Sequence, residues 1–310
     1  EEDPGRMEVL IIDDGSTDGS RAIGKEYEKR FPDTFRVISK ENGGHGSALN
    51  WGIREATGNY IKVVDGDDWL DTEELKKMLR FLETASQDLI AANYCWVDTV
   101  SRKKTVQQEM PFDGVVYGKT YAMDEIGDRT YIKMHSVIIK TEVMRKVPFS
   151  IDEHCYYVDS EYVMFPIPFT KTVVFLDSYL YMYRVGRKHQ SVNTVQMAKN
   201  KFQHLKVFYR LLEYYRWARA RKETTAGQLK YLEHGIALIF KSQYKVFLCC
   251  RYTGALKKEL MDFDRNIRQD YPEIYNRINS RAVEIIRMFH FGMFGPSCFA
   301  FKCISRILRK

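Results

Sequence analysis

The sequence lacks the long apolar runs, paired cysteines and low-complexity segments that mark several large classes of protein. Its longest stretch without Lys, Arg, Asp or Glu is residues 288–301, which His290 and Pro296 interrupt. A membrane-spanning helix needs about 20 consecutive apolar residues, so no segment is predicted to cross a bilayer, and no basic-then-apolar leader opens the chain. The six cysteines form no CxxC pair. Their spacing argues against a disulfide framework and favours reduced thiols in a cytoplasmic protein.

Charge is divided unevenly along the 310 residues. Residues 1–195 carry 25 Lys and Arg against 32 Asp and Glu, whereas residues 196–310 carry 23 against 9. The basic second part is also rich in aromatic residues, and its C-terminal run 289–302 is typical of an interfacial anchor. This composition suggests a surface that faces lipid headgroups or an acidic polymer. The alternative is a solvated, Lys-rich set of helices around an ordinary core.

Short apolar runs alternate with helical patterns in the first hundred residues. The predicted strands are 9–12, 35–38, 60–64 and 89–94, and the predicted helices are 20–31, 48–56 and 71–83. This alternation indicates an α/β fold with a Rossmann-like, mostly parallel sheet, in which ligands bind beyond the carboxyl ends of the strands. Amphipathic patterns at 199–220 and 225–250 predict long helices without strands. We therefore expect two domains, 1–195 and 196–310, with the second mostly helical.

Two acidic clusters follow two of the predicted strands. Residues 13–20 read DDGSTDGS, and residues 65–68 read DGDD. Carboxylates this close together repel one another unless a cation joins them, and oxygen ligands at such a turn suit Mg²⁺ or Mn²⁺. The first cluster could instead be a turn followed by a helix cap. For the second cluster this alternative is weaker, because Asp71 is already placed to cap the next helix.

The clusters belong to a series of motifs that occur in one order along the chain. Its members are IDDGSTDGS at 12–20, ENGGHGSALNWG at 41–52, ATGNYIKVVDGDDW at 56–69, YVDSEY at 157–162 and YMYRVGRKHQSV at 181–192. This series resembles the family 2 glycosyltransferases over roughly residues 8–195. The resemblance implies the GT-A fold, a nucleotide-sugar donor, a divalent metal ion and inverting sugar transfer.

The resemblance also implies roles for individual residues. Asp13 or Asp14 would contact uracil, Asp65 the ribose, and Asp67 the metal ion on the diphosphate. The remaining candidates for the nucleotide-sugar site are Asn42, Gly44, Arg184, Arg187, Gln190 and Ser191, with His189 as a second candidate metal ligand. Asp159 would be the general base, which takes a proton from the acceptor hydroxyl as it attacks. Glu161 is the rival base.

The sequence departs from the family pattern in three ways. The family begins with a strand well before the first acidic turn, whereas only seven residues precede Glu8 here. We therefore expect the first strand and helix of the fold to be missing from this sequence. Val158 replaces the Glu that usually precedes the catalytic Asp. Leu49 stands where relatives often carry Arg, so a contact to the diphosphate or the sugar is either missing or supplied elsewhere, with Lys40 and His45 as candidates.

The sequence thus predicts a metal-dependent inverting glycosyltransferase. It would move a sugar from a UDP-sugar, or another nucleotide sugar, to a hydroxyl of a surface glycan or glycolipid, with Mn²⁺ or Mg²⁺ as cofactor. We expect a cytoplasmic location, either free or peripheral at the inner face of the cell membrane, and no nucleic-acid partner. One alternative is a catalytically inactive binding module for nucleotide sugars or glycans. A sugar-1-phosphate nucleotidylyltransferase is less favoured, because the sequence shows no Gly-rich loop with a basic residue near its start.

Overall fold

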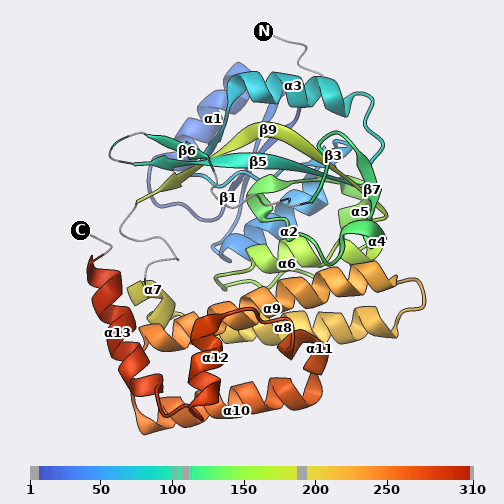
Figure 1. The fold of residues 1–310 in the computed structure, drawn as a ribbon. Coiled ribbons are helices and arrows are strands. Elements are labelled where there is room, and N and C mark those ends of the chain that lie inside the picture. The colour runs from blue at the N-terminus through green and yellow to red at the C-terminus, as the bar shows by residue number, and fades with distance from the viewer. Residues whose placement is uncertain are drawn as a thin grey trace. The chain divides into compact units, whose positions relative to one another are not determined.

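The computed structural model describes residues 7–99, 101, 103–106, 112, 114–186 and 194–307. It divides into two compact units (Figure 1). Unit 1 comprises Glu1–Gly186 with Lys222–Gln228, and unit 2 comprises Arg187–Arg221 with Leu229–Lys310. The functional domains 1–195 and 196–310 remain a proposal from composition.

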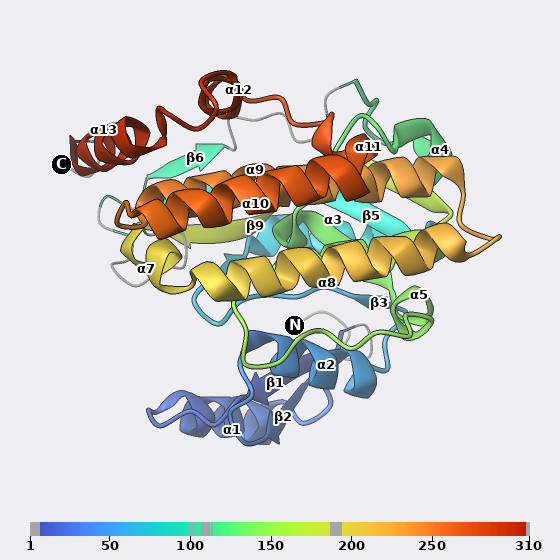
Figure 2. The ribbon, with the colours of Figure 1, turned by 90° about the horizontal axis from the view of Figure 1, so that it is seen from below.

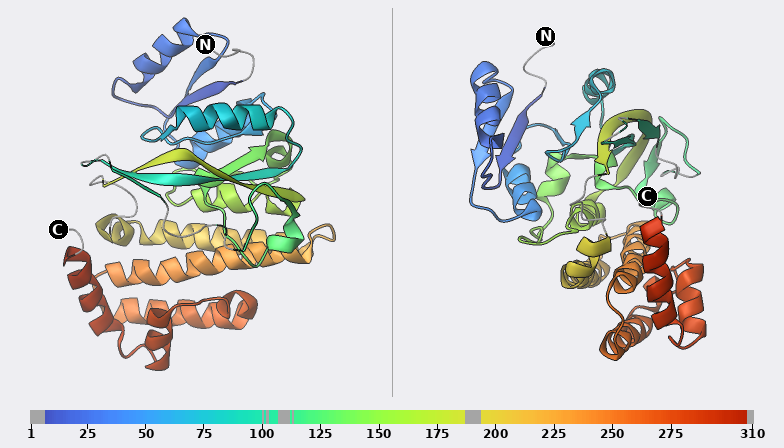
Figure 3. Two further views of the ribbon diagram at one scale, coloured as in Figure 1. Left: turned by 45° about the horizontal axis from the view of Figure 1, so that its top comes forward. Right: turned by 90° about the vertical axis from the view of Figure 1, so that its left-hand side faces the viewer.

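Unit 1 begins with a two-stranded parallel sheet. Strand β1 (Val9–Asp13) pairs with β2 (Phe35–Ser39), and the register runs from Val9 opposite Phe35 to Asp13 opposite Ser39. Parallel neighbours need a crossover connection, which helix α1 (Ser20–Arg30) provides. Helix α2 (His45–Glu55) follows β2 (Figure 3). The carboxyl ends of both strands, with the loops that follow them, therefore lie at one edge.

A larger, seven-stranded sheet forms the centre of unit 1. Its order is β3 (Tyr60–Ile61), β8 (Val137–Lys140), β5 (Leu89–Asp98), β9 (Thr172–Val185) and β4 (Trp69–Leu70), with β6 (Lys104–Val106) on β5 and β7 (Thr120–Ala122) on β9. Among the described residues, β5 and β9 are the one parallel pair of this sheet, and the other pairs of strands are antiparallel.

The predicted α/β class is therefore confirmed, but the larger sheet is mixed rather than mostly parallel. Parallel pairing needs a long crossover connection, whereas a short connection returns the chain antiparallel. Strand β6 begins six residues after β5 ends, so these two strands form a hairpin. Strand 60–64 is also shorter than predicted, because only Tyr60 and Ile61 pair before the chain enters the acidic turn.

The core of unit 1 lies around β5 and β9. The first residues of β5, from Leu89 to Ala92, are almost completely buried, as a central strand requires. Helix α3 (Thr72–Leu82) lies on one face of the sheet, where Met78 packs with Ile90 and Val174 (Figure 1). The carboxylate of Asp71 accepts hydrogen bonds from the first turn of α3, which confirms the predicted cap. The short helices of unit 1 are α4 (Met123–Ile126), η2 (Met134–Ser136), α5 (Thr141–Arg145), α6 (Asp159–Met164) and η3 (Ile167–Phe169).

The described residues of unit 2 form helices joined by loops and contain no strand. Its elements are α7 (Thr194–Lys199), α8 (Lys201–Ala220), α9 (Ala226–Cys249), α10 (Gly254–Asp270), α11 (Pro272–Tyr275), α12 (Arg281–Met288) and α13 (Phe294–Ile307). The long helices α8, α9 and α10 run beside one another (Figure 2). Their core contains Phe208, Phe240 and Phe263, whose ring centroids lie 5.1–5.7 Å apart. None of the helices in the described ranges is long and apolar enough to cross a membrane.

Candidate functional site

Asp14, which follows β1, organises the loop that follows β2. One of its carboxylate oxygens accepts hydrogen bonds from the Lys40 ammonium at 2.5 Å and the Gly43 amide at 2.9 Å, and the other accepts from the Gly44 amide at 2.7 Å. Burial alone would raise the pKa of Asp14, but these donors outweigh it and lower the pKa. Asn42 donates to the Asp14 carbonyl at 2.9 Å. Hydrogen bonds thus join three candidate residues: Asp14 after β1, and Asn42 and Gly44 in the loop after β2.

Asp13 is held beside this loop at the end of β1. Its carboxylate accepts from the Ser16 amide at 3.0 Å and lies 3.3 Å from the Arg21 guanidinium. The hydrogen bonds from Ser16 lower the pKa of Asp13. Only 6% of Asp13 is exposed. The carboxylates of Asp13 and Asp14, the first two of the acidic cluster, are therefore both bonded to groups of the chain itself.

The start of α2 brings the segment that leads to Asp159 against this loop. The His154 amide donates to the Gly43 carbonyl at 2.6 Å. A Cβ atom on Gly46 would lie 2.1 Å from the Asp152 carbonyl oxygen, so only glycine permits this close approach. Gly44 has a φ of 80°, which also favours glycine. The ENGGHG motif therefore joins two segments that lie about a hundred residues apart in the sequence.

The second acidic cluster forms a turn between β3 and β4. Asp65 lies 3.4 Å from the His45 ring at the start of α2. Asp68 accepts a hydrogen bond from the Tyr181 phenol at 2.6 Å and another from the Arg184 amide at 2.8 Å. Burial raises the pKa of Asp68 to about 6, although these donors oppose the shift. Burial would raise the pKa of Asp65, but His45 outweighs it and lowers the pKa.

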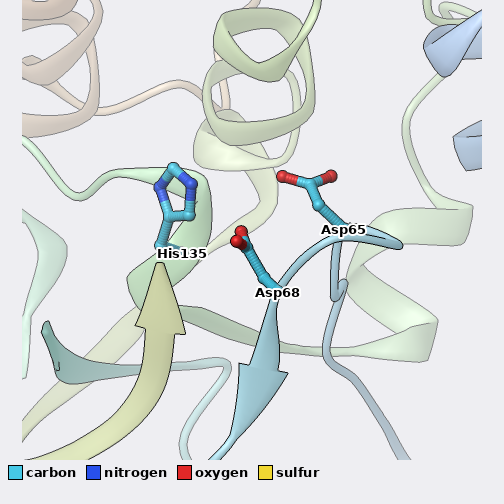
Figure 4. Close-up of side chains that lie close together, drawn as sticks. All are labelled: Asp65, Asp68 and His135. Carbon is cyan, nitrogen blue, oxygen red and sulfur yellow. The ribbon is translucent and has the colours of Figure 1, made fainter. Parts of the chain in front are cut away.

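His135 completes a group that could hold a metal ion. One ligand atom from each of Asp65, Asp68 and His135 lies within 4.8 Å of the others. Figure 4 shows the Asp68 carboxylate between the other two side chains. Burial lowers the pKa of His135 to about 4, so its imidazole is neutral near pH 7. Its Nδ1 atom is buried and has no hydrogen-bond partner among the described residues.

Lys62 and Tyr181 contact the residues of this group and the acidic turn. The Lys62 ammonium donates to the His135 carbonyl and lies 4.8 Å from the centre of the Tyr181 ring. Burial lowers the pKa of Lys62 to about 7. The Tyr181 oxygen accepts a hydrogen bond from the Asp65 amide at 3.2 Å. One ring on β9 therefore bonds to both ends of the acidic turn.

Asp159 is the first residue of α6, and its side chain is exposed to solvent. Desolvation by surrounding protein atoms raises its pKa, with a further contribution from Asp65, while His45 opposes the shift. The rival base, Glu161, is completely buried and accepts a hydrogen bond from the Asp152 amide at 2.8 Å. Exposure at the start of α6 therefore favours Asp159 over Glu161 for contact with a bound molecule.

The remaining residues predicted for the site either are not members of the metal-holding group or lie outside the described residues. Asp67 is partly buried and is not a member of the metal-holding group found among the described residues. The Arg184 guanidinium lies 5.3 Å from the Trp69 ring centre. Arg187, His189, Gln190 and Ser191 lie outside the described residues. Sequence reasoning missed His135, Lys62 and Tyr181 as site residues. His135 stands in none of the motifs, whereas Lys62 and Tyr181 lie within the motifs at 56–69 and 181–192 but were given no role there.

Comparison with known proteins shows similarity to one family of glycosyltransferases. Residues 1–151 match the family model described as Glycosyl transferase family 2. The chain is 28% identical over 195 residues to the putative glycosyltransferase EpsH of Bacillus subtilis (strain 168), which covers 58% of this chain and 52% of EpsH. It is 26% identical over 204 residues to the minor teichoic acid biosynthesis protein GgaB of the same organism, covering 64% of this chain and 22% of GgaB. The chain thus spans about half the length of EpsH and less of GgaB.

Solved structures show the same fold. Staphylococcus aureus TarS 1-349 in complex with UDP has a TM-score of 0.60 at 15% identity, over 100% of this chain and 84% of that chain. The complex of TarS 1-349 with UDP-GlcNAc has a TM-score of 0.55 at 16% identity, over 86% of this chain and 76% of that one. The predicted GT-A fold, with its helical C-terminal region, and the resemblance to family 2 are both confirmed.

Proposed function

Because residues 1–151 match the model of glycosyl transferase family 2, we propose that the protein is a metal-dependent inverting enzyme of this family. It moves a sugar from a UDP-sugar to a hydroxyl of a surface glycan or glycolipid. The relatives named above support sugar transfer, GgaB supports a polymer of the cell surface as acceptor, and the UDP complexes of TarS support the nucleotide.

The donor site in this proposal is the edge formed by the loops after β1 and β2. Asp14 acts as a positioning residue, since its carboxylate already accepts three hydrogen bonds from the chain. The loop that it holds presents Asn42 and Gly44 to the uracil and ribose. Asp13, which lies beside it, and Arg184, near Trp69, remain donor contacts implied by the family motif.

The donor set of Asp65, Asp68 and His135 fits a divalent cation. Two carboxylates and a neutral imidazole suit Mn²⁺, whereas Mg²⁺ prefers oxygen ligands alone. The buried, unpartnered Nδ1 of His135 is the observation that supports a ligand here. The family motif adds Asp67 and His189 as further candidates. When bound, the ion would neutralise negative charge on the diphosphate leaving group.

Asp159 is the general base in this proposal. A general base must be ionised and able to reach the acceptor hydroxyl, and it works best when its pKa lies near the operating pH. Asp159 is exposed, stands at the start of a helix, and has a raised pKa. Its carboxylate would take the proton from the acceptor hydroxyl as that oxygen attacks the anomeric carbon. His45 and Asp65 lie close enough to influence its pKa. The charges of the proposed donor site therefore affect the protonation of the proposed base.

The observation that carries the proposal is the convergence of the acidic turn, His45 and His135 within unit 1. The test is to incubate the protein with Mn²⁺ and a panel of nucleotide sugars and to measure nucleoside diphosphate release. We expect release of UDP, with the anomeric configuration of the product inverted as seen by NMR. A binding module would bind UDP-sugar without releasing UDP. A nucleotidylyltransferase would instead release pyrophosphate from a nucleoside triphosphate and a sugar 1-phosphate.

A further inference from the structure

The last two helices of unit 2, α12 and α13, each pack one face inward. Val283 and Ile286 of α12, and Phe294 and Cys298 of α13, are at most 3% exposed. Phe301 packs on a buried cluster formed by Met197, Val246 and Cys249. These contacts fix both helices on the rest of unit 2 (Figure 2). Their opposite faces are therefore presented to solvent in a defined orientation.

The opposite faces carry large apolar side chains. The exposed fractions are 46% for Ile285, 65% for Met288, 52% for Phe289, 41% for Met293 and 73% for Phe299. Ile285, Met288 and Phe289 follow the spacing of one helical face. We call these five residues the α12–α13 apolar surface. Large apolar side chains exposed in one short stretch of a soluble protein often mark a surface that meets a partner.

The turn between the two helices holds this surface in place. His290 and Phe291 have φ values of 48° and 60°, a conformation that L-residues other than glycine adopt at a cost. The Phe291 amide donates to the Ile286 carbonyl at 2.8 Å, and the Gly292 amide donates to the Phe289 carbonyl at 2.7 Å. Phe291 is 9% exposed whereas Phe289 is 52% exposed. The turn therefore buries one aromatic ring and leaves its neighbour outside.

Positive charge is concentrated in the same stretch of the sequence as the apolar surface. Residues 281–310 contain Arg281, Arg287, Lys302, Arg306, Arg309 and Lys310 against a single acid, Glu284. Arg287 is paired with the buried Asp264 at 2.7 Å and is not available to a partner. The other cations give the segment a net positive charge. A second copy of the chain would bring two such segments together, and an acidic polymer would leave the apolar side chains in water.

We propose that the α12–α13 apolar surface inserts into the headgroup region of an anionic lipid bilayer, with Arg281 and Lys302 of the same helices on lipid phosphates. Apolar side chains beside Lys and Arg are the composition that binds at a membrane interface without spanning it. The inference does not depend on the proposed sugar transfer, because it concerns residues of unit 2 alone.

Co-sedimentation with vesicles tests the proposal. The full chain should pellet with vesicles of phosphatidylcholine mixed with phosphatidylglycerol, and much less with phosphatidylcholine alone. Binding should weaken as salt rises, because charges are screened over a Debye length of about 8 Å at physiological ionic strength. Equal pelleting with both kinds of vesicle, or none with either, would overturn the proposal.

Variants locate the surface. Met288→Ser, Phe289→Ser and Phe299→Ser combined should lower the vesicle partition coefficient at least about tenfold. The matched control combines Phe202→Ser, Tyr209→Ser and Met261→Ser, which are 72%, 48% and 39% exposed on α8 and α10; it should bind as the parent does. Replacing the same three α12–α13 residues by Leu should retain binding, which excludes misfolding as the cause. An equal loss of vesicle binding in the test and control variants would contradict the assignment. A parent chain that sediments as a dimer, and becomes monomeric in the α12–α13 variant, would also contradict it.

Discussion

The phenol oxygen of Tyr181 lies 2.6 Å from a carboxylate oxygen of Asp68 and donates a hydrogen bond to it. The same oxygen accepts from the Asp65 amide. Tyr181 itself is completely buried on β9. The geometry of the acidic turn therefore depends on a side chain that lies more than a hundred residues away in the sequence.

Tyr181→Phe should loosen this turn. It removes a buried donor to a carboxylate, which typically costs about 1–3 kcal/mol of unfolding free energy. Divalent cation binding should weaken as well, because Asp65 and Asp68 lose their common anchor. Urea unfolding and calorimetry with Mn²⁺ measure the two effects. Tyr183→Phe is the control, since its ring also contacts His135, at 4.3 Å between centroids. Similar losses in both variants would show that the Tyr181 hydroxyl has no special role.

Gly46→Ala should separate α2 from the segment that leads to Asp159. The new Cβ would lie 2.1 Å from the Asp152 carbonyl oxygen, which is backbone and cannot rotate away. We expect a loss of about 1–3 kcal/mol of stability, as for overpacking elsewhere. Gly52→Ala lies in the same helix, where the nearest atom is 3.9 Å away. It should raise stability by about 0.5–1 kcal/mol through helix propensity. Thermal unfolding of both variants decides the matter.

The proposed metal site makes two predictions that can be measured together. Asp67→Asn should abolish the tightening of UDP binding by Mn²⁺, if the family motif assigns the ligand correctly. His135→Gln should weaken Mn²⁺ binding by about tenfold or more, as expected when a ligand is removed from a site of few ligands. Calorimetry with and without Mn²⁺ measures both. An unchanged metal effect in Asp67→Asn together with a loss in His135→Gln would place the ion on the Asp65, Asp68 and His135 group alone.

The stability of unit 2 should fall in mild acid because of His204. This side chain is 3% exposed and hydrogen-bonds to Gln243 at 2.6 Å. Burial lowers its pKa from 6.5 to about 4. Between these values the unfolded chain binds a proton that the folded chain does not, so stability present above pH 6.5 is lost as the pH falls toward 4. The full effect is about 3 kcal/mol. Urea midpoints for the parent and His204→Gln should converge as the pH is lowered, and parallel profiles would contradict the assignment.

Local signals made much of the fold predictable. Capping by Asp71 places the start of α3 at Thr72, and the composition of 199–220 and 225–250 predicts α8 and α9 to within two residues. The pairing of the larger sheet was not predictable in the same way. The position of β5 between β8 and β9 depends on contacts between distant segments, which no local pattern encodes.

In the candidate site, too, some residues could be predicted from local sequence and others could not. Acidic and glycine-rich motifs identify Asp14, Gly44 and Asp65, because their chemistry is unusual for a turn. His135 stands alone in an ordinary-looking segment, and only the fold brings it to the acidic turn. For Asp14, the motif predicts contact with a ligand. In the structure its carboxylate instead accepts hydrogen bonds from Lys40, Gly43 and Gly44, at the end of β2 and in the loop that follows.

The most direct test of the central claim is the rate of UDP release from a UDP-sugar in the presence of Mn²⁺ and acceptor, measured for the parent and for Asp159→Asn. The parent should turn over, and Asp159→Asn should bind UDP with unchanged affinity while losing roughly 10²–10⁴-fold in rate, the usual contribution of a positioned general base. Glu161→Gln should lose much less rate, because its carboxylate is buried on the Asp152 amide. A parent that binds UDP-sugars without releasing UDP, or an Asp159→Asn variant as fast as the parent, would contradict the account.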